Sequence, residues 1–445
     1  MASQGVLLGS ILLTAGAIAL AGCSGSGKTP SLSKAGPEVD PSTVPVPPAD
    51  GPKLAIQGAI VAVMDRPSHD GKPIGWLRAG ALATRSVDAV TKRDCPGGWY
   101  PIRPRGFLCV GQGVTLDLRA GAQAAGKAPP RLDAPLPYSY ARTTEATSLY
   151  EWDKSKGAAV KEAGKIRRGS GVALVGEWDA QVPDGSKAHL ALTPDGKFVD
   201  VANIKPVEAP AFKGIELTDQ AKLPVAFVLK QGVRYWRVQK DEAEKRARVE
   251  GAGLIPLTGK FRTVRGENFW ATEEDGKYLR HKDVTLVPKR HVYPDFANGD
   301  QKWIDISIVT GALVAYEGRK PVYATLVSPG RERFGDPKVT ASTAMGTFHV
   351  VGKQVTSSQA PTKPFAEEAD MRDAPWVLEL SSGQVLHGAY WHSRFGVEHG
   401  AGNVALAPTD ALWVFRWATP ELPEGWHGVT AAPDSERKTL VVIHK

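Results

Sequence analysis

The segment 387–413, which reads HGAYWHSRFGVEHGAGNVALAPTDALW, contains the residue types and spacing best suited to chemistry. Three histidines, His387, His392 and His399, lie close together in it. A neutral imidazole can take a proton from a nucleophile near neutral pH, which is general base chemistry. The histidines lack the spacing of zinc ligands with a fourth partner, and the glycines that follow lack the lysine of a phosphate-binding loop. We therefore expect no metal and no cofactor here, and a histidine taken alone could equally be a surface or core residue.

This segment resembles the active-site region of the L,D-transpeptidase (YkuD-like) family. Members of that family carry a His-Gly followed, after a short loop, by Ser-His-Gly-Cys-x-Asn. The resemblance covers about a third of the chain, Trp303 to Lys445, and implies that His387 occupies the position of the family's base. It also implies a substrate-binding role for Gly388, Trp391, His399, Gly400 and Gly402. The flanking matches, in family order, are Leu313, Tyr316, Gly318, Pro321 and Val322, then Met345–Val350, Ala374–Val377 and Leu406–Trp413.

The cysteine of the family motif is absent, and two alignments remain open. Without gaps, Ser-His-Gly-Cys-x-Asn falls on 400–405, and Asn403 takes the cysteine position. With two residues lost before the motif and two gained after it, His399, Gly400 and Asn403 match, and Ala401 takes the cysteine position. The first alignment is geometrically simpler, and the second keeps more of the chemistry.

The resemblance also implies a reaction. In L,D-transpeptidases a cysteine thiolate attacks the carbonyl between the third and fourth residues of a peptidoglycan stem peptide and expels D-alanine. A second stem, a protein or water then takes the acyl group. Neither an alanine nor an amide nitrogen can make this attack, and Ser393 or Thr409 would need stronger activation than a thiol. We predict a domain that binds stem peptides without acyl transfer. The alternatives are an active transpeptidase with a variant site and a purely structural spacer.

The chain has three cysteines, and each is explained outside this segment. Cys23 ends Leu-Ala-Gly-Cys after the apolar run 6–20, which resembles the lipobox of a bacterial lipoprotein signal, although no basic residue precedes the run. That resemblance implies lipid attachment at Cys23 and a periplasm-facing position in the bacterial cell envelope, with a transmembrane anchor as the alternative. In an oxidising compartment, Cys95 and Cys109 are expected to form a disulfide rather than remain free thiols.

The rest of the chain predicts a mainly β protein of several small units that carry the last domain. The 47 glycines and 34 prolines, with short runs of Val, Thr, Trp and Tyr, favour strands joined by tight turns. The predicted units are a signal peptide (1–23), a flexible tether (24–52), a Src-homology-3-like barrel with the disulfide (53–119), a second small β module (136–207), a third β-rich module (208–290) and an L,D-transpeptidase-like β-sandwich with a short helix after the active-site loop (291–445).

The net charge of +8 suits a protein that works beside an anionic polymer, although dispersed lysines are also common in exported proteins. The chain lacks zinc-finger spacing and an aromatic-studded basic sheet, so we expect no nucleic-acid partner. The expected partners are peptidoglycan, a membrane through Cys23, and other envelope proteins. Two local predictions are a charged turn or short helix over 241–250 and a helix over 406–413, with Asp410 in its first turn near the positive end of the helix dipole.

Overall fold

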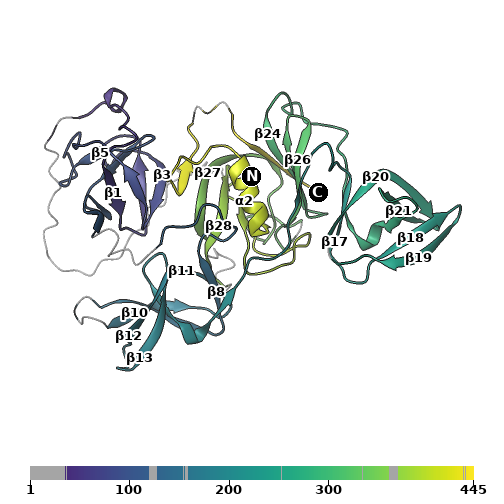
Figure 1. The fold of residues 1–445 in the computed structure, drawn as a ribbon, viewed down its shortest axis with the longest axis horizontal. Coiled ribbons are helices and arrows are strands. Elements are labelled where there is room, and N and C mark those ends of the chain that lie inside the picture. Colours follow the sequence, from purple (N-terminus) through teal and green to yellow (C-terminus); the bar gives the residue numbers. More distant parts are fainter. Residues whose placement is uncertain are drawn as a thin grey trace, which may run out of the picture.

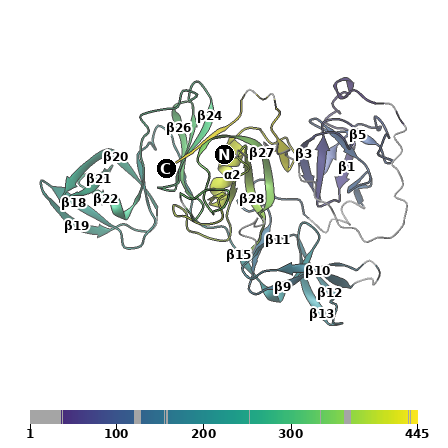
Figure 2. The same ribbon diagram turned by 180° about the vertical axis from the view of Figure 1, so that it is seen from behind.

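The computed structural model describes residues 36, 38–119, 128–153, 155, 159–251, 253–332, 334–359, 369–433, 435 and 437–445. Strands dominate these residues, which confirms the prediction of a mainly β protein. The last domain lies in the middle of the molecule, and three smaller β modules surround it (Figure 1). Figure 2 shows the same arrangement from behind. The predicted signal peptide, Cys23 and the first part of the predicted tether lie outside the described residues.

The first module has the barrel-like form that its alternating sequence predicts. β1 pairs with β4 and β7, while β2 pairs with β3 and β6, and β5 pairs with β6. Leu54, Ile56 and Leu77 are among the buried side chains between the strands. Its strands are β1 (Lys53–Ile56), β2 (Ile60–Met64), β3 (Pro73–Arg78), β4 (Leu82–Thr84), β5 (Trp99–Pro101), β6 (Phe107–Cys109) and β7 (Val114–Thr115).

The structure departs from the predicted tether over residues 38–52. Pro41–Thr43 form a short 3-10 helix, η1, whose first turn is capped by the Asp40 carboxylate. Arg103 of the first module donates a hydrogen bond to the carbonyl oxygen of Pro47 at 2.7 Å. This proline-rich stretch therefore lies along the surface of the first module, because a side chain of that module donates a hydrogen bond to one of its backbone carbonyls.

The second module consists of two small sheets. One has the order β10-β9-β14-β13-β12, and in the other β8 pairs with both β11 and β15. Apolar side chains such as Leu149, Val172 and Val199 are buried between them. Its elements are β8 (Ser139–Thr143), β9 (Thr147–Trp152), β10 (Val160–Ile166), β11 (Gly171–Leu174), β12 (Gly176–Gln181), β13 (Lys187–Leu192), β14 (Phe198–Asp200), η2 (Val201–Asn203) and β15 (Ile204–Val207).

The third module is a seven-stranded sheet, and it differs from its prediction in two respects. β16 (Ile215–Glu216) pairs with β26 of the last domain, so residues near 215 pack with that domain. The predicted charged turn or helix over 241–250 is wrong: the alternating charged residues 242–248 form β19, an exposed strand paired with β18. The elements are β17 (Val225–Val228), β18 (Arg234–Gln239), β19 (Glu242–Arg248), β20 (Gly253–Val264), β21 (Glu267–Thr272), β22 (Tyr278–Arg280), η3 (His281–Asp283) and β23 (Thr285–Val287).

The last domain is built from two sheets that share the strands β26 and β27. In one sheet β26, β25, β24, β32 and β27 are neighbours, and in the other β26, β30, β29, β28 and β27. Ile304, Leu378 and Phe415 are among the buried residues that join both sheets and the helix α2. The elements are β24 (Lys302–Ser307), β25 (Ala312–Glu317), β26 (Lys320–Ser328), β27 (Gly346–Gln359), β28 (Met371–Leu380), β29 (Val385–Gly388), β30 (Val404–Leu406), α2 (Pro408–Trp417), β31 (Gly428–Thr430) and β32 (Leu440–His444).

The first module is joined to the last domain by shared sheet and shared core. β3 pairs with β31, with Gly75 opposite Val429 and Trp76 opposite Gly428. Trp426, just before β31, is buried among the core residues of the first module. The two units therefore cannot separate without exposing a tryptophan and breaking a strand pair.

Candidate functional site

His387 lies in the middle of the second sheet, on β29. Its neighbour across the parallel pair with β30 is Ala405, and Leu386 on the same strand pairs with Leu378 of β28. The side chain is only 4% exposed. Two flanking strands and this burial hold the imidazole in one place.

The protonation state of His387 follows from its surroundings. Nδ1 lies 3.2 Å from the carbonyl oxygen of Gly388. A carbonyl can only accept a hydrogen bond, so the proton belongs on Nδ1 and the lone pair on Nε2. Burial lowers the pKa of His387 to about 4, because a buried imidazolium loses its hydration. At neutral pH His387 is therefore an uncharged base.

Trp391 covers the imidazole of His387. The two rings are stacked, with centroids 5.3 Å apart and an interplanar angle of 26°. Trp391 is in turn held from the second module, because Arg142 Nη1 donates to its carbonyl oxygen at 3.3 Å. Tyr140 of the same module packs against Tyr390 with ring centroids 4.2 Å apart. The second module thus forms part of the wall of this site.

The loop at the predicted nucleophile position approaches a neighbouring segment closely. Gly400 and Gly402 both have φ of +95°, a conformation that side chains disfavour. The carbonyl oxygen of Gly402 accepts hydrogen bonds from Thr343 Oγ1 at 2.9 Å and from Gln384 Nε2 at 2.8 Å. These contacts fix the turn that leads into β30.

Asn403 and Ala401 occupy different surroundings in this loop. Asn403 is half-buried and directly precedes β30. Its Oδ1 accepts a hydrogen bond from the backbone N–H of Val385 at 3.1 Å, two residues before His387. Ala401 is exposed and lies between the two glycines with positive φ. The structure therefore brings the Asn403 side chain, rather than that of Ala401, against the strand that carries His387.

Comparison with known proteins gives a family match for the last domain. Residues 301–443 match the family model of the L,D-transpeptidase catalytic domain, YkuD. The last domain is a YkuD domain. No curated protein sequence matches the chain.

Three solved structures illustrate the similarity. An L,D-transpeptidase from Xylanimonas cellulosilytica is 18% identical, with 35% of this chain and 64% of that one covered and a TM-score of 0.24. The catalytic domain of the E. faecium L,D-transpeptidase is 14% identical, with 32% and 97% covered and a TM-score of 0.24. The L,D-transpeptidase from Mycobacterium smegmatis is 12% identical, with 54% and 89% covered and a TM-score of 0.25. The chain thus spans slightly less than two thirds of the Xylanimonas structure.

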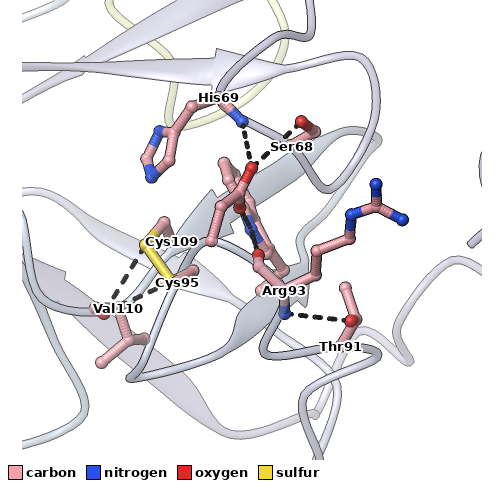
Figure 3. The surroundings of a disulfide bond; sticks show 9 residues. Ser68, His69, Thr91, Arg93, Cys95, Cys109 and Val110 are labelled. Carbon is pink, nitrogen blue, oxygen red and sulfur yellow. Dashed lines mark hydrogen bonds between the residues drawn. A yellow bond between two sulfur atoms is a disulfide. The ribbon is translucent and has the colours of Figure 1, made fainter. Parts of the chain in front are cut away.

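The YkuD domain contains no cysteine anywhere in its sequence. Cys95 and Cys109 form a disulfide in the first module, with Cα atoms 5.9 Å apart, which confirms the predicted pairing. Figure 3 shows this bond beside the loop of Ser68 and His69. Neither sulfur is a thiol, so neither can serve as a nucleophile in the YkuD domain.

His392 and His399 also meet in the YkuD domain, close to Trp391. Their ring centroids are 4.2 Å apart, and burial, followed by the nearby His399 and His387, lowers the pKa of His392 to about 3. Burial therefore keeps His392 uncharged at neutral pH, with its ring packed against that of His399. Within the residues that the structure describes, no group of three or more His, Cys, Asp or Glu side chains is arranged to hold a metal ion.

Asp410 has a larger structural role than the predicted interaction with the helix dipole. It lies in the first turn of α2, as predicted, but it is fully buried. Its carboxylate accepts hydrogen bonds from Gly214 N at 2.8 Å, from Tyr323 OH at 2.7 Å and from Thr325 Oγ1. Burial raises its pKa to about 6. Asp410 thus ties the helix after the site to β26 and to the segment before β16.

Several residues around the site were not predicted from the sequence. Arg142 and Tyr140 are about 250 positions away from Trp391 and Tyr390 in the chain, and neither belongs to a motif. Thr343 and Gln384, which hold Gly402, are small polar residues of common types. Only the long-range strand pairing brings them to the loop.

Proposed function

We propose that this protein is a bacterial cell-envelope lipoprotein whose YkuD domain binds peptidoglycan stem peptides without acyl transfer. The observation that carries the proposal is a retained base beside a position with no nucleophile. His387 has the uncharged state that could activate a thiol, while the adjoining loop offers Asn403. The Asn403 amide is neither acidic nor nucleophilic near neutral pH.

The surroundings of the loop favour Asn403 as the vacated cysteine position. The Asn403 side chain contacts Val385 of β29, two residues before His387, and β30 and α2 then follow with one residue between them. Ala401 is exposed between two glycines. A catalytic nucleophile must lie near its base, and of the two candidates Asn403 has the side chain that is hydrogen-bonded to the strand carrying His387.

The proposed location in the envelope rests on the sequence. Cys23 and the apolar run before it lie outside the described residues. Across the part of the chain that the structure describes, no helix is long and apolar enough to span a membrane. The disulfide supports an oxidising compartment, because such bonds are rare where thiols are kept reduced.

Retention on isolated sacculi tests the proposal directly. We expect the full chain to sediment with sacculi at low salt and to release no D-alanine from them. A matched Trp391→Ala variant should be retained less, because it removes the ring that covers His387. Failure of the native chain to sediment with sacculi at low salt would remove the proposal.

The second candidate function is an active transpeptidase that uses a variant site. The observation in its favour is that His387 keeps the lone pair on Nε2 and is uncharged at neutral pH, so it is able to accept a proton. Release of D-alanine from a stem peptide, lost in a His387→Ala variant, would establish this function and exclude the first.

A further inference from the structure

A large cleft separates the third module from the YkuD domain. Its volume is about 1770 Å³, and its walls come from residues 211–216, from β17 and η3, from the loop 393–397 and from α2. β17 adjoins the last domain in Figure 1, on the side where the third module lies. Pockets for small molecules usually have volumes of about 300 to 1,000 Å³, so this cleft has room for an extended chain.

Aromatic rings form much of the wall contributed by the YkuD domain. Tyr323 and Trp413 are stacked with centroids 4.1 Å apart, and Trp413 and Trp417 follow at 5.7 Å and 20°. Across the cleft, Phe212 packs on Phe395 at 5.5 Å. Tyr323 and Phe395 are buried, whereas Phe212, Trp413 and Trp417 are half-buried. The exposed parts of these three rings are apolar surfaces, against which the C–H faces of sugar rings and aliphatic side chains can pack.

The cleft also carries an excess of unpaired positive charge. Lys213, Lys230 and Arg394 line it, and among the described residues none of the three forms an ion pair. The opposing acids are few: Asp283 is paired with Arg280 at 2.8 Å, which leaves Glu216. Lys213, Lys230 and Arg394 are all exposed. Their unpaired positive charges at the edge of the cleft favour a ligand with carboxylates, most strongly at low salt.

One loop separates this cleft from the His387 site. Phe395 lines the cleft, and its ring centroid is 5.0 Å from that of His392. His392 directly follows Trp391, the residue that covers His387. On the other side, a Cβ atom at Gly396 would lie 3.1 Å from Leu229 of the third module. The same loop therefore packs against the His387 site and forms part of the cleft wall.

We propose that this cleft is a second binding site, for a carboxylate-bearing glycan–peptide strand of the cell wall. The proposal rests on the proposed function, since the stem peptide at His387 and the strand in the cleft would belong to the same polymer. Trp413 and Trp417 bind the apolar faces of the strand, and the three cations bind its free carboxylates. The third module thereby selects polymeric over monomeric ligand.

Charge reversal on the cleft wall tests this assignment. In the full chain, the double variant Lys213→Glu/Lys230→Glu is compared with Lys205→Glu/Lys260→Glu, which has the same change in net charge at exposed lysines elsewhere. The probes are soluble uncross-linked peptidoglycan strands, the same strands with amidated carboxylates, and a single stem peptide. We expect the cleft variant to bind native strands at least tenfold more weakly than the control variant, and the native chain to discriminate against amidated strands.

The outcomes separate the two proposals. Equal affinity of the cleft and control variants for strands, with stem-peptide binding intact, would overturn the cleft assignment alone. If the native chain binds neither the strands nor the stem peptide, the proposed function is overturned. A DNA oligonucleotide of equal charge serves as a competitor. If it competes as well as the strands themselves, the cleft binds any polyanion, and the assignment is overturned.

Discussion

His387 is the residue in which the local environment decides the chemistry. It has the sequence context of a base, and its strand buries it beneath Trp391. Burial excludes water from the imidazole and keeps it uncharged at neutral pH. The same burial couples this residue to stability, because the unfolded chain can protonate it at a much higher pH.

The His387→Asn variant should flatten the acid side of the stability profile. The folded pKa of about 4 lies below the ordinary value of 6.5, so the unfolded chain binds the proton first on acidification. Stability from this residue is present above pH 6.5 and is lost as pH falls to 4. The loss is on the order of 3 kcal/mol. The measurement is the free energy of unfolding from urea melts between pH 4 and 7.

Other buried groups shape the same profile and define its control. His392 and His427 have pKa values lowered to about 3 and about 4, so they act in the same direction. Asp410 acts in the opposite direction, because its pKa is raised to about 6 and stability from it falls as pH rises from 3.8 to 6. His291 is exposed, so the control variant His291→Asn should show the same dependence of the free energy of unfolding on pH as the native chain. An unchanged slope in His387→Asn would contradict the buried, neutral state.

For single residues, the sequence predicts His387 as the base but does not predict the residues that position the neighbouring side chains. The His-Gly context and the downstream glycines are local signals, and the structure places Gly402 against Gln384, the residue before β29. Arg142 and Tyr140 could not be found in this way, because their contacts with the site depend on how a separate module docks.

At the scale of elements, strand pairing positions the site more than any single contact. β29 lies between β28 and β30, and α2 begins two residues after β30 ends. The sequence predicted this helix because proline and an acidic residue open it. It misidentified β19, since a run of charged residues has no hydrophobic period to distinguish a strand from a turn.

The attachment of the first module depends on a glycine. A Cβ atom at Gly75 would lie 2.1 Å from the ring of Trp426, so Gly75→Ala must displace this buried tryptophan or separate β3 from β31. We expect Gly75→Ala to lower the free energy of unfolding by about 1 to 3 kcal/mol, as is typical of overpacked sites. Hydrogen exchange of the amides in β3 and β31 measures it directly.

A matched glycine gives the control for this prediction. A Cβ atom at Gly253, at the start of β20, would meet nothing within 4 Å. Gly253→Ala should therefore leave exchange in β3 and β31 unchanged. Equal protection of these strands in Gly75→Ala and the native chain would show that the junction tolerates a methyl group.

At the scale of the whole molecule, three β modules surround one YkuD domain and each contributes differently. The first shares its core with Trp426, the second touches Trp391, and the third forms a cleft with α2. The mainly β character was predictable from turn spacing, and the disulfide from two nearby cysteines in a chain expected to be exported. The docking of the modules was not, because it depends on side chains that meet across hundreds of residues.

We propose that the molecule keeps the frame of a transpeptidase and lacks only its nucleophile. The most direct test is intact mass after incubation with a carbapenem, whose strained ring opens on attack by a thiolate and stays attached to it. The native chain should gain no mass, and Asn403→Cys should gain the full mass of the carbapenem in a reaction that His387→Ala slows. Ala401→Cys is the matched control and should react more slowly than Asn403→Cys. An adduct on the YkuD domain of the native chain, or a faster reaction of Ala401→Cys, would contradict the account.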